Sequence, residues 1–102
     1  MAKFLFTYTG GSTPTSPEEG AQVMAAWVGW FQGIGAGVVD MGNPTGPTKT
    51  VGAGGAVSDT SGPTGYSIIS ADSFDAAVGH AKGCPVLGAG GTVLVTEVQE
   101  MM

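Results

Sequence analysis

The chain has 102 residues, a net charge of −5, three lysines and no arginine. A length of 102 residues fits one domain, so we expect a single domain over residues 1–102. Nucleic-acid binding needs a basic surface that displaces counterions, and base reading relies on arginine, so the composition argues against a nucleic-acid partner.

The first predicted element is a strand over residues 3–9. Phe4, Phe6 and Tyr8 alternate with less bulky side chains, so the three aromatic rings share one face. The opposite face is also partly apolar. A strand with two partly apolar faces is expected to lie in the centre of its sheet.

A helix is predicted to begin at Pro17. Ser16 is suited to cap it, Pro17 fits the first helical position, and Glu19 completes a capping box. Its apolar residues recur at helical spacing, and they are Met24, Trp27, Phe31 and Ile34. Trp30 lies off this stripe, which favours a place at a subunit contact or on the wall of a pocket.

The middle of the chain combines a short strand with a glycine-rich and proline-rich segment. Residues 38–42 are predicted to form a second strand. A structureless loop over residues 43–65 would be unusually long for a small domain. We therefore expect a hairpin inside it, with strands at 49–51 and 56–58.

The last third of the chain repeats the strand, helix and strand order. Residues 65–71 alternate as a strand, and Asp72 is predicted to cap a second helix that ends before Gly83. Its buried stripe is predicted to be Phe74, Ala77, Val78 and Ala81. Residues 92–98 form the last predicted strand, and residues 99–102 form a loosely ordered tail.

The order of these elements predicts an α+β fold of the ferredoxin-like type, with an antiparallel sheet, two helices on one face and an inserted hairpin. The helices leave the other sheet face uncovered. Charged residues make up only 11% of the chain, against about 25% in a typical domain. Weakly polar surface of this kind is most simply covered by a second subunit, so we expect a homodimer.

Several short motifs are similar to those of the YCII-related family, including its DGPF-type branch. The first strand runs into residues 8–11 (Tyr-Thr-Gly-Gly), which carry the first resemblance, and residues 75–85 carry the second. A Gly-Gly pair at 90–91 then precedes a valine-rich strand with Glu97. The motif that names the branch is echoed at residues 58–63, without a phenylalanine after the proline.

The resemblance implies a ferredoxin-like fold that pairs into a dimeric α/β barrel. It also implies an acid–base pair, with a histidine at the end of the first strand and an aspartate at the end of the second. Asp40 stands where that aspartate falls. Thr9 stands in the histidine position, so this chain lacks the complete pair.

Three functions follow as hypotheses. The first is binding of a small metabolite in a cleft between the sheet and the 43–65 loop, with ligand contacts from Tyr8, Thr9, Asn43 and Trp30. The second is a small-molecule enzyme of lyase, isomerase or hydrolase type that uses Asp40 for proton transfer. The third is a purely structural dimer. For Asp40 the alternative role is to accept backbone N–H groups in the turn after its strand.

The remaining reactive side chains favour structural roles. His80 and Cys84 are four residues apart, but Gly83 is expected to end the helix between them and no third metal ligand is apparent. We therefore expect no metal and no cofactor. Residues 20–39 carry no charge but include five glycines, so a soluble helix is preferred to a membrane span. A lone cysteine and a short apolar N-terminal run favour a cytoplasmic setting.

Overall fold

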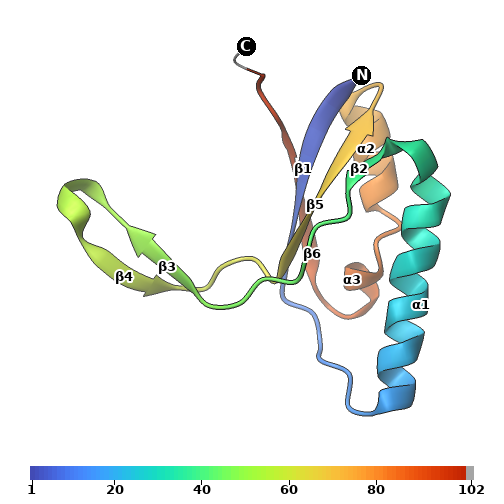
Figure 1. The fold of residues 1–102 in the computed structure, drawn as a ribbon, viewed down its shortest axis with the longest axis horizontal. Coiled ribbons are helices and arrows are strands. Elements are labelled where there is room, and N and C mark those ends of the chain that lie inside the picture. The colour runs from blue at the N-terminus through green and yellow to red at the C-terminus, as the bar shows by residue number, and fades with distance from the viewer. Residues whose placement is uncertain (101–102) are drawn as a thin grey trace.

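The computed structural model describes residues 1–100 and contains a four-stranded sheet, three helices and a separate two-stranded hairpin (Figure 1). Residues 101–102 lie outside the described residues. They are the last two residues of the predicted domain (1–102) and of the predicted tail (99–102). In chain order the elements are β1 (Ala2–Thr9), α1 (Pro17–Ile34), β2 (Val38–Asp40), β3 (Thr48–Val51), β4 (Val57–Thr60), β5 (Gly65–Ala71), α2 (Phe74–Ala81), α3 (Pro85–Gly88) and β6 (Thr92–Glu97). Short 3-10 turns occupy Gly35–Gly37 and Ala53–Gly55.

The sheet has the strand order β2-β5-β1-β6, and every neighbouring pair is antiparallel. Without the hairpin, the order of elements is βαββαβ, which is the ferredoxin-like arrangement. This confirms the predicted α+β fold class. The predicted central position of β1 is also confirmed, because β1 lies between β5 and β6.

The core lies between this sheet and the helices. Phe4, Phe6 and Tyr8 of β1 are at most 5% exposed and face the helices. Phe4 lies opposite Ile69 of β5, and Phe6 lies opposite Ser67. Residues directly opposite in an antiparallel pair share a face, so the aromatic face of β1 continues into β5 as the sequence alternation predicts.

The other side of the sheet, which we call the open face, has six residues at its centre: Leu5, Thr7, Tyr66, Ile68, Leu94 and Thr96. Around them on the same face lie Lys3, Thr9, Asp40, Ser70 and Thr92. None of these side chains is buried. Figure 1 shows α1 and α2 on the opposite side of the sheet, and within residues 1–100 no helix covers the open face.

Helix α1 begins as predicted. The Ser16 hydroxyl accepts a hydrogen bond from the Glu19 backbone N–H at 3.1 Å, and Pro17 occupies the first turn. The capping box is only half formed, because the Glu19 carboxylate accepts a hydrogen bond from the Thr15 hydroxyl at 3.0 Å. The helix ends at Gly35, whose positive φ of 70° suits glycine.

The helix lies loosely on the sheet. Trp27, Trp30 and Ile34 pack against the core, but no residue of α1 is fully buried. Met24 belongs to the predicted apolar stripe, but its side chain is 66% exposed. The helix contacts the sheet mainly through its C-terminal half, and Met24 lies in the half beyond those contacts.

The second helix starts one residue later than predicted. Ser73, not Asp72, is the N-cap, and its hydroxyl accepts from the Ala76 N–H at 3.0 Å. Both residue types cap helices well, so composition alone does not choose between them. Ala77 and Ala81 are buried as predicted, but the prediction of burial is wrong for Phe74, which begins the helix and is 47% exposed. The single-turn helix α3 was not predicted.

The expected hairpin forms from β3 and β4, but it stands away from the sheet (Figure 1). It lengthens the molecule to 44 × 39 × 18 Å. The radius of gyration is 15.1 Å, against about 13 Å for a compact domain of this length. Across residues 1–100, no helix is both long and apolar enough to span a bilayer.

Candidate functional site

A cavity of about 580 Å³ lies where the end of β1 and its following loop meet α1 and α3. Its lining comprises Gly10, Gly11, Ser12, Thr13, Pro14, Glu19, Gln22, Val23, Ala26, Trp27, Thr64, Pro85, Val86, Gly88 and Ala89. Small-molecule pockets typically enclose about 300–1,000 Å³. The cavity is therefore large enough for a small organic ligand.

The lining is apolar with a few polar groups. The Trp27 ring provides an aromatic wall and lies edge-on to Tyr8, with centroids 4.9 Å apart. Gln22 offers an amide, and Glu19 is the only ionisable side chain among the described lining residues. A lining without a cation lacks the partner that a phosphate or carboxylate ligand requires.

Thr64 fixes the rim of this cavity to the end of β1. Its backbone N–H donates to the Tyr8 carbonyl at 2.6 Å, and its hydroxyl donates to the same carbonyl at 3.2 Å. The chain then leaves β1 through Gly11, whose φ of +91° is rarely adopted by other residues. The geometry of the cavity rim therefore depends on backbone contacts between segments distant in sequence.

Tyr8, a predicted ligand contact, points into the core. Its hydroxyl donates to Ser67 Oγ at 2.7 Å, and Ser67 Oγ donates to the Met41 carbonyl at 2.7 Å. Burial raises the pKa of Tyr8 from 10.0 to about 12, against a smaller lowering effect of the Ser67 hydrogen bond. The hydroxyl is thus neutral and already paired.

Thr9 lies on the opposite side of the sheet from Tyr8. It faces Thr92 of β6, and the two hydroxyls hydrogen-bond to each other. Successive strand residues alternate between faces. The structure therefore does not bring Tyr8 and Thr9 into one cleft, although they are neighbours in sequence.

Asp40 is exposed at the end of β2, and its Oδ1 accepts from the Gly42 N–H at 2.8 Å. It lies opposite Ile68, which in turn lies opposite Leu5. Thr9 is four residues further along β1, about 13 Å away along the strand. Asp40 and Thr9 are therefore separated, and neither lines the cavity.

Asn43 is a predicted site residue that lies near Tyr8 across the sheet, because both neighbour Gly65 of β5. Its carbonyl accepts from the Tyr66 N–H at 3.3 Å. Gly65 lies between the Asn43 carbonyl oxygen and the Tyr8 ring. A Cβ atom added to Gly65 would lie 3.3 Å from that oxygen and 3.3 Å from the ring. The Asn43 side chain is exposed and lies outside the cavity lining.

Trp30, predicted to lie on a pocket wall or at a subunit contact, packs against the core and does not line the cavity. The Trp30 indole N–H donates to the His80 carbonyl at 2.9 Å, which joins α1 to α2. Its ring packs against Phe6, with centroids 6.2 Å apart. Trp27 of the predicted apolar stripe packs against the core and also lines the cavity.

Cys84 and His80 do not form a reactive pair. Cys84 is buried before α3, and burial raises the pKa of its thiol from 9.0 to about 11. A protonated thiol is a poor nucleophile. Among residues 1–100, no group of three or more histidine, cysteine or acidic side chains is arranged to hold a metal ion.

The cavity residues Glu19, Gln22 and Thr64 were not predicted as site residues. Glu19 was interpreted as a helix-capping residue, and Gln22 lies on the polar side of the same helix. Two features complete the cavity wall: helix α3, and the hydrogen bonds from Thr64 to the end of β1. Neither feature has a local sequence pattern that would predict it. Among the predicted features, the loop at Gly10 and Gly11 is part of the family resemblance and also lines the cavity.

The sheet order and the two helices on one side define an α+β protein with a ferredoxin-like fold. No protein-family model matches the chain, and no curated protein matches it. Among solved structures, the chain is similar to 5-chloro-2-hydroxyhydroquinone dehydrochlorinase from Burkholderia phenoliruptrix, solved in complex with 2,5-dihydroxybenzoquinone. The two chains are 23% identical with a TM-score of 0.56, over 96% of this chain and 94% of the other. At this identity the likeness shows the fold alone.

Proposed function

We propose that this chain is a YCII-related protein that binds a small, uncharged ring compound in the cavity beside Trp27. The observation that supports this most is the cavity itself, about 580 Å³ in volume and lined mainly by apolar groups with Gln22 and Glu19 at one side. The similar structure was solved with a dihydroxylated ring compound. The sequence resemblance described above supports the family assignment.

The lining favours a particular ligand chemistry. A flat ring packs well against the Trp27 indole, and ring hydroxyls match the Gln22 amide and the Glu19 carboxylate as hydrogen-bond partners. Glu19 would repel an anion, and the described lining has no cation to offset that repulsion. A neutral dihydroxylated ring is therefore favoured over a carboxylate of the same size.

The test is a titration of ¹⁵N-labelled protein with hydroquinone, with benzoate as the anionic comparison. We expect hydroquinone to shift the amide signals of the cavity residues and benzoate to leave them unchanged. Ala26→Leu should fill the cavity and weaken binding at least tenfold. Ala25→Leu is the matched control, because Ala25 is exposed on the same helix and outside the lining.

Absence of shifts at the lining residues with every ring compound tried would contradict this proposal. Equal weakening by Ala25→Leu and Ala26→Leu would also contradict it, because the loss would then reflect the helix and not the cavity. A chain that forms dimers but binds no ring compound would match the structural hypothesis instead.

A second candidate is an enzyme that uses Asp40 for proton transfer. It is favoured by one observation, that the similar structure is named as a dehydrochlorinase. Incubation with a chlorinated hydroxyhydroquinone should then release chloride, and Asp40→Asn should abolish this release with the fold intact. No chloride release by the unmodified chain, or full release by Asp40→Asn, would rule this role out.

We also propose that two copies pair through the open face. The chain exposes 6661 Å², whereas a folded monomer of 10.1 kDa is expected to expose about 5,300 Å². The excess of about 1,400 Å² exceeds the roughly 800 Å² that each partner buries in a standard interface. Pairing of two open faces is the arrangement implied by the dimeric α/β barrel type.

A further inference from the structure

The β3–β4 hairpin, which we call the arm (residues 48–60), has almost no support from the rest of its own chain. Every residue from 49 to 60 is exposed. Its apolar side chains near the tip, Val51 and Val57, are 69% and 61% exposed. A lone two-stranded hairpin is only marginally stable in water, so the arm requires a surface to pack on.

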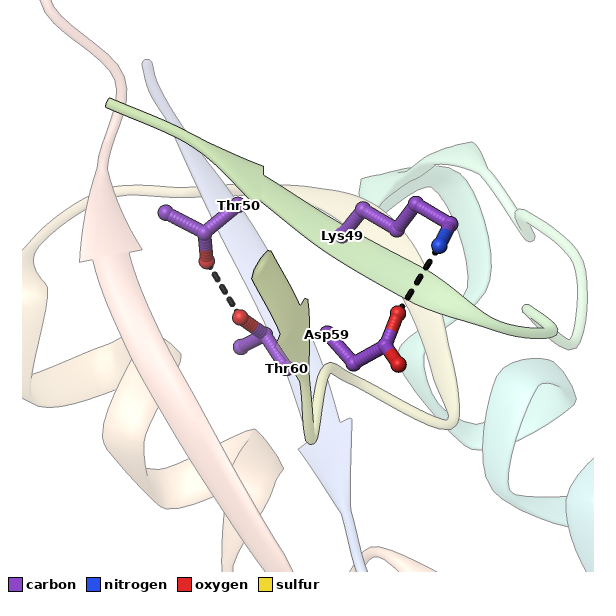
Figure 2. Close-up of polar contacts among 4 residues, drawn as sticks. All are labelled: Lys49, Thr50, Asp59 and Thr60. Carbon is purple, nitrogen blue, oxygen red and sulfur yellow. Dashed lines mark hydrogen bonds and ion pairs between the residues drawn. The ribbon is translucent and has the colours of Figure 1, made fainter. Parts of the chain in front are cut away.

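The interactions inside the arm are weak. Figure 2 shows Lys49 Nζ beside Asp59 Oδ1, at 2.8 Å, and the hydroxyl of Thr50 directed at that of Thr60. The ion pair is widely exposed to water, with 65% of the lysine and 90% of the aspartate side chain accessible. Exposed ion pairs contribute little to stability.

The direction of the arm indicates what it packs on. In Figure 1, α1 and α2 lie on one side of the sheet and the arm extends on the other, beyond the open face. Its base is held where Pro44 bridges to Gly65 and the Thr45 N–H donates to the Thr64 carbonyl at 3.1 Å. A molecule seated on the open face would therefore lie beside the arm.

We propose that the arm of each chain packs against a second copy of the chain seated on its open face. This inference rests on the homodimer proposed above and assigns the arm to its interface. Both surfaces fit a copy of the same acidic chain, because the centre of the open face is uncharged, Lys3 and Asp40 at its edges carry opposite charges, and Lys49 balances Asp59 within the arm. Two molecules of charge −5 can thus meet through neutral surfaces.

The two sides of the arm differ in chemistry. One side carries only hydroxyls, from Thr48, Thr50, Ser58 and Thr60. The other carries the Lys49–Asp59 pair and, nearer the tip, Val51 opposite Val57. Burial of the valines gains more than burial of hydroxyls, so the valine side is the one that contacts the second copy.

The direct test uses a nitroxide label at the tip of the arm. Ala53→Cys is labelled in a Cys84→Ala background and mixed in equal amount with ¹⁵N-labelled wild-type chain without nitroxide. We expect signal loss in the ¹⁵N-labelled copy that disappears when the nitroxide is reduced. A label at Gly79→Cys, on the exposed side of α2, should cause no such loss.

Each outcome decides between the two proposals. A dimer by sedimentation without signal loss from the arm label would overturn the arm's role and leave the dimer standing. A monomer at every concentration would overturn both. A second sample, dilute A53C/C84A protein that carries both the nitroxide and the ¹⁵N label, tests contacts within one chain. Signal loss in this sample alone would mean that the arm folds back on its own sheet, and would also overturn the inference.

A matched pair of variants tests which side of the arm makes contact. Val51→Thr with Val57→Thr keeps the side-chain shape and β-propensity but replaces methyl groups by hydroxyls, and should raise the dimer dissociation constant at least tenfold. Thr50→Val with Thr60→Val changes the hydroxyl side and should alter it less than threefold. The reverse order of effects would overturn the assignment of the valine side.

Discussion

Tyr8 illustrates how a residue suited to a binding site serves the core of this protein. It lies one residue before the end of β1, close to the Gly10 and Gly11 turn, where a ligand contact was predicted. The strand alternation that places Phe4 and Phe6 in the core places Tyr8 there too. Its hydroxyl therefore needs a buried partner, and Ser67 and the Met41 carbonyl complete the chain of hydrogen bonds.

Replacement of Tyr8 by phenylalanine tests this chain of hydrogen bonds. Tyr8→Phe should lower the free energy of unfolding by about 1 kcal/mol, because Ser67 Oγ loses the donor that satisfies it. Urea denaturation followed by circular dichroism measures the change. Tyr66→Phe is the control, since Tyr66 lies on the open face, and equal effects of the two variants would contradict the role of the bond.

Stability should fall in alkaline solution, with two distinguishable contributions. Burial keeps Cys84 protonated up to a pKa of about 11 and Tyr8 up to about 12, whereas the unfolded groups ionise near 9.0 and 10.0. The native state therefore binds more protons than the unfolded state above about pH 9, so these two groups make the free energy of unfolding fall as pH rises from 9 to 12 and contribute no pH dependence well below that range.

Urea denaturation at intervals between pH 7 and pH 11 would measure this fall. Cys84→Ala should remove the part that begins near pH 9, and Tyr8→Phe the part that begins near pH 10. A free energy of unfolding that stays level across this range in the wild-type chain would show that neither group is protected from ionisation by burial.

At the scale of the elements, the sequence predicted the strands and the first helix well because their signals are local. The alternation in β1 and β5 and the Ser16-Pro17 helix start each lie within a few residues. The cavity has no such local signal. It depends on α3 and on the return of Thr64 to the Tyr8 carbonyl, a contact between residues 56 apart in the chain.

The glycines of two elements should respond oppositely to alanine. A Cβ at Gly42, after β2, would lie 1.6 Å from the Tyr66 carbonyl oxygen at a φ of +74°, so Gly42→Ala should destabilise the chain by about 3 kcal/mol or more. Gly29, in α1, has open space around it. Gly29→Ala should stabilise the chain by about 1 kcal/mol.

Thermal and urea unfolding of these two variants give both numbers in one experiment. Destabilisation by Gly29→Ala would mean that α1 contacts something at that position in solution. A tolerated Gly42→Ala would show that the turn after Asp40 adopts another conformation.

At the scale of the whole molecule, the chain exposes more surface than its mass requires. The excess of about 1,400 Å² comes from features that the sequence predicted separately, namely a sheet with two partly apolar faces and a hairpin in the 43–65 segment. The sequence did not predict which side of the sheet stays uncovered or in which direction the arm extends, because both depend on tertiary packing. In the structure, the open face and the arm lie on the same side of the molecule (Figure 1).

The pairing of open faces predicts a specific response to a charge at Leu94. This side chain is 51% exposed in the single chain and lies opposite Thr7 in the open face. Leu94→Glu would bury an unpaired carboxylate in the interface, which is costly. We therefore expect the dimer dissociation constant to rise at least tenfold, as measured by sedimentation equilibrium.

Leu87→Glu is the matched control, because Leu87 is similarly exposed, at 43%, but belongs to α3 on the helix side of the sheet. It should leave the dissociation constant within threefold of the wild-type value.

The melting temperature gives a second measurement, because a dimer becomes more stable as its concentration rises. The melting temperatures of the wild-type chain and of Leu87→Glu, both without ligand, should therefore rise as the protein concentration is raised from 1 to 100 μM. That of Leu94→Glu should rise less over the same range. If all three chains respond alike, the two copies meet through some other surface.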